Sequence, residues 1–183
     1  MKRICLVLVG LFLLAGLAIA DSHQQVCLNN TPVCKDLIAA QHYDAGNVCA
    51  EVVGDYLVVT LYTTGGWKFV DAHMWWGLTL DDMPLTKKGN PKIGHFPYYS
   101  GDILGWTMYQ FMVPLAEIGG MDYLNTLCGQ RIKLAVHANV KKWIYCTGYQ
   151  YETAWASGSE ITPGRSWAMY FAIEFSCDCV NGD

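Results

Sequence analysis

Three strand-like segments of this chain carry side chains that could do metal or acid–base chemistry. Asp71 and His73 lie in the run WKFVDAHMWWG. His137 lies in AVHANV, and Glu152 opens ETAWASG. Two imidazoles and a carboxylate satisfy zinc and similar ions, and the same groups could form an acid–base pair if they converged. These four residues are therefore the candidate ligand-binding set, and a metal-dependent hydrolase is the activity that they would support.

The alternative for each of these residues is a structural role. A histidine on an apolar strand is more often a hydrogen-bonded core residue than a ligand or a base. The chain also has no serine-centred elbow, no phosphate loop and no His-Glu-x-x-His run. We predict that Asp71 and His73 are buried and hydrogen-bonded, and we expect no catalytic residue, no metal ligand and no cofactor.

The densest run of β-branched and aromatic residues, 55–77, must position the first pair of these side chains. Its first half alternates, Thr-Thr-Gly-Gly interrupts it, and Trp67 restarts an extended run. Glycines supply the positive φ of a tight reversal, so the pattern predicts a β-hairpin. In the second strand Asp71 and His73 share one face. Both faces are largely apolar, which is typical of a strand inside a sandwich or barrel.

The remaining chain alternates between extended runs and turn-rich segments. Breakers exclude regular structure from most of 79–105, and a short piece at 33–43 is compatible with a helix. This pattern predicts an all-β fold, a single-domain antiparallel β-sandwich of jelly-roll or immunoglobulin type, at 46–183. A cysteine-containing N-terminal arm at 21–45 precedes it. Extended runs are expected at 47–53, 106–114, 131–140, 166–177 and 141–151, the last either extending 131–140 or forming a hairpin with it.

Residues 1–20 have the features of a secretory signal peptide. Lys2 and Arg3 precede an apolar run, and Ala18-Ile19-Ala20 precedes Asp21. An uncleaved membrane anchor is the alternative, because the apolar run is at the short edge of a spanning helix. No later segment is apolar enough for long enough to span a bilayer. We expect cleavage before Asp21 and a secreted, extracellular protein without a membrane span.

The amino-acid composition indicates which classes of binding partner to expect. The net charge is -4, 15% of the residues are charged and 13% are aromatic, so there is no basic footprint for nucleic acid and no sign of disorder. Seven tryptophans and eleven tyrosines suggest a lectin, although aromatic residues that fill the core explain them more simply. Asn29-Asn30-Thr31 is an N-glycosylation acceptor pattern at Asn29.

Cleavage of the signal peptide would remove Cys5 and leave an odd number of cysteines. Disulfides are favoured over zinc, because paired Cys-x-x-Cys spacing is absent. Cysteines separated by one residue, such as Cys177 and Cys179, rarely bond each other, so each should reach a different N-terminal cysteine. A third bridge is expected between Cys128 and Cys146. One cysteine of the arm would then stay free to bond a second copy or another surface protein. The full set is Cys27, Cys34, Cys49, Cys128, Cys146, Cys177 and Cys179, with Cys27 or Cys34 as the free one.

Four blocks of this sequence together resemble a known kind of domain. The blocks WKFVDAHMWWG, KKGNPKIGHFPY, AVHANV and ETAWASGSEITPGRSWAMYF occur in this order across about 46–175. They resemble an uncharacterised β-domain of secreted and cell-surface proteins from bacteria and various eukaryotes. The resemblance implies an extracellular β-domain and assigns no catalytic residue.

The sequence thus favours a secreted, non-catalytic structural or adhesive module of a cell surface or extracellular assembly. A glycan-binding module is the alternative, and a metal-dependent hydrolase is a weaker one. The expected partners are a second copy or another surface protein, joined through a disulfide, or glycans.

Overall fold

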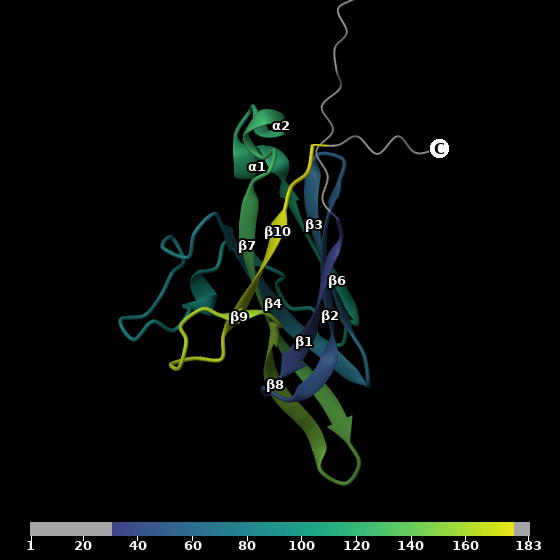
Figure 1. Cartoon of the computed structure of the whole chain (residues 1–183). Coiled ribbons are helices and arrows are strands. Elements are labelled where there is room, and N and C mark those ends of the chain that lie inside the picture. Colours follow the sequence, from purple (N-terminus) through teal and green to yellow (C-terminus); the bar gives the residue numbers. More distant parts are fainter. Residues whose placement is uncertain (1–30, 178–183) are drawn as a thin grey trace, which may run out of the picture.

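The computed structural model describes residues 31–177 of the 183-residue chain (Figure 1). The predicted signal peptide, the start of the mature chain, and the candidates Cys27, Asn29 and Cys179 lie outside the described residues. Within 31–177, no helix is long and apolar enough to cross a membrane.

The described chain is built mainly of antiparallel strands, as predicted. Two short α-helices and one 3-10 helix interrupt them: η1 (Ile93–His95), α1 (Leu115–Gly119) and α2 (Tyr123–Thr126). The strands are β1 (Val33–Ala39), β2 (Tyr43–Val53), β3 (Tyr56–Thr63), β4 (Trp67–Gly77), β5 (Tyr98–Tyr99), β6 (Met108–Pro114), β7 (Arg131–Ile144), β8 (Gly148–Ala156), β9 (Ser159–Glu160) and β10 (Met169–Glu174).

The strands form one sheet in the order β5-β4-β7-β8-β1-β2-β3-β6, with β10 also paired to β7 and β9 paired to β10. The segment between β5 and β6 brings the two ends of this order together. Phe69 of β4 donates its backbone N–H to Trp106 at 2.9 Å, and Thr63 of β3 donates to Thr107 at 2.9 Å. The sheet is therefore nearly closed around its core. A two-sheet sandwich is not confirmed, because one continuous ladder joins these strands.

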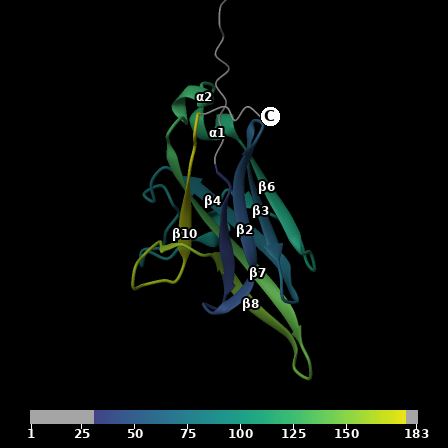
Figure 2. The ribbon, with the colours of Figure 1, turned by 45° about the vertical axis from the view of Figure 1, so that its right-hand side comes forward.

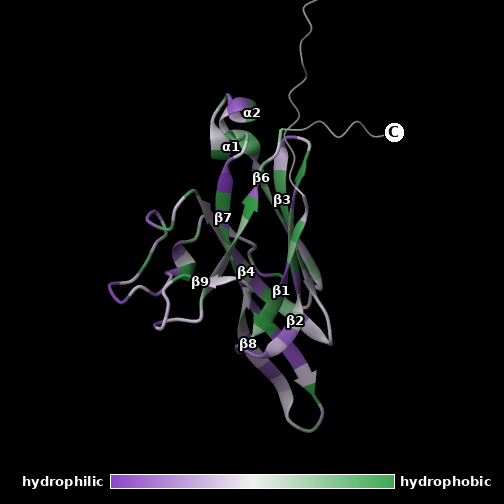
Figure 3. Cartoon of the chain, in the orientation of Figure 1, coloured by the Kyte–Doolittle hydropathy of each residue, from purple (hydrophilic) through white to green (hydrophobic). Residues whose placement is uncertain are grey.

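Strand β7 shows how the sequence pattern becomes a core. Its alternate residues Ile132, Leu134, Val136, Ala138 and Val140 are fully buried. Successive side chains of a strand point to opposite faces, so the intervening residues face outward. Figure 3 shows this alternation as bands of hydrophilic and hydrophobic residues along the strands. A second, smaller apolar cluster covers part of the outward face, where it buries Ala135 and Trp155 beneath the segments that contain Phe96 and Ile161.

The predicted hairpin at 55–77 is wrong in its pairing, although the reversal occurs where predicted. Gly65 and Gly66 have φ of 58° and 86°. Yet β3 pairs with β2 and β6, whereas β4 pairs with β5 and β7. Each strand is interior to the sheet and has both edges occupied by other strands. The glycine turn therefore carries the chain from one part of the sheet to another.

The helix considered for 33–43 is also wrong, because this segment contributes strand β1. Its residues alternate about the sheet, with Leu37 and Ala39 fully buried in the core. Cys34 lies directly opposite Cys49 on β2, and the two form a disulfide with an S–S distance of 2.02 Å. Residues 33–39 of the predicted arm are therefore an integral strand between β8 and β2.

The second described disulfide joins Cys128 to Cys177, and the predicted Cys128–Cys146 bridge is wrong. Those two cysteines flank β7, whose 14 residues span about 45 Å when extended. A disulfide needs Cα atoms within about 7 Å. Cys177 accordingly does not reach the N-terminal cysteines. Cys34 is not free, because it is bonded to Cys49. The free cysteine among the described residues is Cys146, which is exposed.

Candidate functional site

The four resembling blocks come together in space, because they contribute the neighbouring strands β5, β4, β7 and β8. His73 on β4 lies directly opposite His137 on β7. On the outer sides of this pair, Tyr99 lies opposite His73 and Trp155 lies opposite His137. Side chains directly opposite each other share one face of a sheet. The result is a row of four rings across four strands, which we call the histidine row.

The two imidazoles of the histidine row lie between two aromatic side chains. The His73 and His137 ring centroids are 6.3 Å apart. His73 stacks on Tyr99 at 4.6 Å with an interplanar angle of 20°, and His137 meets the edge of Trp155 at 5.0 Å. Such contacts favour a fixed ring orientation. The row is thus a packed aromatic arrangement.

Asp71 is next to the row and shares its face. Its Oδ1 accepts a hydrogen bond from Nδ2 of Asn139 at 2.8 Å and lies 3.9 Å from Nε2 of His73. Asp71 and His73 are part-buried, with 21% and 15% of their side chains exposed. The predicted hydrogen bonding is confirmed for Asp71. It is wrong for Nδ1 of His73, which is buried and has no partner within 31–177.

His137 is the most unusual residue of the site. It is 3% exposed, and neither of its ring nitrogens has a hydrogen-bond partner among the described residues. Burial, together with a smaller effect of the nearby His73, lowers the pKa of His137 to about 3. Burial also lowers the pKa of His73, against an opposing effect of the Asp71 carboxylate. Both imidazoles are therefore neutral at neutral pH.

Glu152, the fourth predicted member, does not join the site. It lies opposite Val140, on the face away from His137, and its Oε1 accepts a hydrogen bond from Nε2 of Gln150 at 2.9 Å. A shift of one residue along a strand moves a side chain to the other face. Within 31–177, no group of three or more His, Cys, Asp or Glu side chains is arranged to hold a metal ion.

Sequence reasoning missed three members of the site, Tyr99, Asn139 and Trp155. Alternation within AVHANV places Asn139 on the face of His137, so this neighbour could have been found from the pattern. Tyr99 and Trp155 depend on which strands pair, which the pattern does not show. The site that results is a row of rings that is buried at His137 and Trp155 and exposed at Tyr99, with a hydrogen-bonded carboxylate at its side.

A different surface feature lies further along the same face of β7 and β8. Trp143, Tyr149 and Tyr151 are 59%, 53% and 60% exposed. The ring centroids of Trp143 and Tyr149 are 5.0 Å apart, and those of Tyr149 and Tyr151 are 6.2 Å apart. Nζ of Lys141 lies 4.5 Å from the centroid of the Tyr149 ring. We call these three rings and Lys141 the aromatic platform.

The aromatic platform belongs to a hairpin that extends beyond the rest of the sheet, at the lower end of Figures 1 and 2. Cys146 lies in the turn that joins its two strands. The neighbouring Tyr145 is among the most exposed large side chains of the described chain, at 87%. A free thiol and four exposed aromatic rings thus gather at the end of the hairpin.

Comparison of the chain with protein-family models, with curated proteins and with solved structures finds no match. Function is therefore argued from the side chains and surfaces described above.

Proposed function

We propose that the protein is a secreted, non-catalytic adhesive module that attaches to its partner through the β7–β8 hairpin. The aromatic platform, exposed on the extended hairpin with a free cysteine at its tip, is the observation that carries the proposal. Large aromatic side chains are usually buried, so a group of exposed rings indicates a contact surface. Tryptophan and tyrosine are also enriched among the residues that dominate binding energies.

The packing of the platform supports binding rather than chance exposure. Trp143, Tyr149 and Tyr151 contact one another in sequence, and Lys141 lies over the central ring. Rings that already hold one another lose little freedom when a partner covers them. The platform therefore offers a pre-organised apolar surface with one positive charge.

Cys146 supplies a means of covalent attachment. The sequence suggested an unpaired cysteine that bonds another chain, and Cys146 is the free and exposed cysteine of the described residues. In an oxidising compartment an exposed thiol readily forms an intermolecular disulfide. Secretion is supported by the signal-peptide pattern, and the Cys34–Cys49 and Cys128–Cys177 disulfides are compatible with it.

Electrophoresis of the secreted protein with and without reductant tests covalent assembly. We expect a disulfide-linked dimer or adduct without reductant, and its loss in Cys146→Ser. Trp143→Ala should weaken the assembly under reducing conditions, as measured by sedimentation. Trp106→Ala is the matched control, because Trp106 is 56% exposed and lies outside the hairpin. A protein that is monomeric throughout, with a free thiol at Cys146, would refute assembly through this hairpin.

Glycan binding is the second candidate, and the platform is also the observation that favours it. Flat exposed rings can stack on the CH faces of sugars, and Lys141 adds a hydrogen-bond donor beside them. A glycan array probed with the wild type and with Trp143→Ala separates the two candidates. Specific glycan binding that Trp143→Ala abolishes and Trp106→Ala leaves intact would select a lectin-like module.

A further inference from the structure

A charged hollow lies where strand β8 ends. Strand β1 pairs with β8 only through residues 37–39. Because β8 ends at Ala156, the residues of β1 before 37 extend beyond the end of β8. Strand β10 instead pairs with the first part of β7. Figures 1 and 2 both show β1 and β10 on either side of this region. The hollow, which we call the slot, has a volume of about 430 Å³ and is lined by Lys35, Arg131, Lys133, Gly158, Ser159, Tyr170, Phe171 and Ala172.

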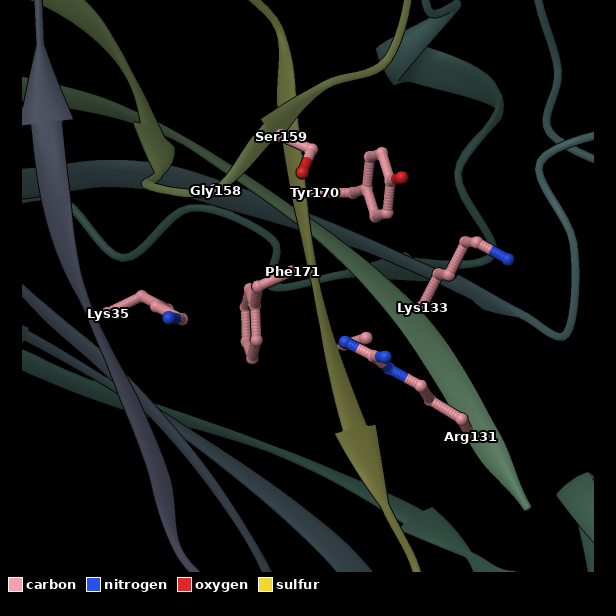
Figure 4. Close-up of a pocket in the computed structure, with 8 residues that line it drawn as sticks. Lys35, Arg131, Lys133, Gly158, Ser159, Tyr170 and Phe171 are labelled. Atoms are coloured by element: carbon pink, nitrogen blue, oxygen red, sulfur yellow. The ribbon is translucent and has the colours of Figure 1, made fainter.

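The lining of the slot is positively charged, although the whole protein carries a net charge of -4. Among the described residues that line it, three side chains are cationic and none is a carboxylate. Figure 4 shows Lys35 extending from β1 toward β10, and Arg131 extending from β7 toward the same strand. Ser159 and Tyr170 add hydroxyl groups at the upper side of the slot in this view. The described lining thus combines cations and hydroxyl groups and contributes no negative charge.

The position of Lys35 is unusual for a lysine. It alternates with Val33, Leu37 and Ala39, so its side chain starts from the core-facing side of β1. Lysine is almost never placed inside a fold without a partner. Yet Lys35 is only part-exposed and forms no ion pair within the described part of the chain. A cation on the inner side of a strand is stabilised by a paired anion, and residues 31–177 supply none to Lys35.

In the described part of the chain, no carboxylate forms an ion pair with either of the other two cations. Glu174 lies opposite Arg131 in the ladder, but no ion pair joins them. Nζ of Lys133 donates a hydrogen bond to the backbone oxygen of Leu78 at 2.8 Å, which leaves its charge uncompensated. Protection of an open strand edge can explain an inward-pointing lysine. It does not explain why Arg131 and Lys133 line the same space.

We propose that the slot is a binding site for an oxyanion, namely a sulfate or carboxylate group. Lys35 and Arg131 supply the charge, and charge-assisted hydrogen bonds are the strongest that such groups form. Arg131 can bind two oxygens at once, while Lys35 acts as a point charge from the other side. The ligand is either a free anion or an acidic sugar that carries the same group. This site is separate from the aromatic platform and does not depend on the function proposed for it.

Titration of the full secreted chain with sodium sulfate, sodium acetate, a sulfated disaccharide and a uronic-acid disaccharide tests the proposal. Ionic strength is held constant with sodium chloride, because exposed charges are screened by salt. Binding is followed by calorimetry and by NMR of the backbone amides of residues 158–159 and 170–172. We expect saturable binding of at least one oxyanion, with shifts confined to these amides and to those of the three cationic residues of the slot. Tighter binding of a disaccharide than of its free anion would identify an acidic sugar, and equal binding would identify the anion alone.

Matched variants assign the binding to the slot. Lys35→Met keeps the aliphatic stem and removes the charge, so the affinity should fall at least about tenfold. Arg131→Gln should also lower the affinity for the oxyanion. This second variant still tests the slot if Lys35→Met does not fold. Lys68→Met, which changes an exposed lysine of β4, should bind like the wild type. The proposal is overturned if no oxyanion saturates, or if both slot variants retain wild-type affinity.

Discussion

Replacement of His137 by leucine should stabilise the protein, which is unusual for a change at a fully packed position. A neutral imidazole has one N–H donor and one acceptor nitrogen, and both are buried without a partner in the described residues. Each unsatisfied group costs about 1–3 kcal/mol. Leucine removes this penalty, while imperfect packing beside Trp155 returns about 1 kcal/mol. The two penalties together are about 2–6 kcal/mol, so we expect a net gain of about 1–5 kcal/mol in the free energy of unfolding at pH 7.

The gain should increase in acid, because the pKa of His137 is lowered to about 3 in the folded state. Between about pH 6.5 and pH 3 the unfolded chain binds a proton at this residue and the folded chain does not, so the wild type loses stability as the pH falls. At 1.36 kcal/mol per unit, the loss is about 2–3 kcal/mol at pH 4.5. His137→Leu removes this contribution, and its advantage should grow by the same amount.

Urea unfolding followed by tryptophan fluorescence at pH 7 and about pH 4.5 measures both effects, with the disulfides kept intact. His95→Leu is the control, because the same substitution at an exposed histidine should change little. One result would contradict this reasoning: His137→Leu is less stable than the wild type by more than about 1 kcal/mol, and its free energy of unfolding depends on pH as that of the wild type does. The His137 nitrogens must then have a partner, and the reasoning fails.

Two further predictions concern stability. Loss of the Cys34–Cys49 disulfide in the double serine variant should lower the free energy of unfolding by about 3 kcal/mol, because the bridge closes a separation of 15 residues; urea unfolding without reductant measures it, and an unchanged midpoint would contradict it. Gly158→Ala should cost about 1–3 kcal/mol, because a Cβ there would overlap the backbone oxygen of Tyr170. Gly94→Ala, where a Cβ meets nothing, should be close to neutral in the same thermal melts, and equal effects would refute the argument.

Several features of this protein could be read from the sequence because they depend on local pattern. The alternation RIKLAVHANV defines a strand with one apolar face, and this is the buried face of β7. The two glycines after Thr64 mark a reversal, and the chain reverses there. Breakers in 79–105 predict irregular structure, and most of that segment is irregular. Period and turn chemistry act over a few residues, so they are visible in one dimension.

Other features were decided only when distant strands met. Strand β4 pairs with β7 instead of its neighbour β3, and this pairing brings His73 against His137. Glu152 is excluded from the site by the face it occupies, and Cys128 bonds Cys177 because β7 holds Cys146 far away. A repeat of two residues specifies which face a side chain occupies. It does not specify the partner strand, because that choice depends on how all the apolar faces are buried together.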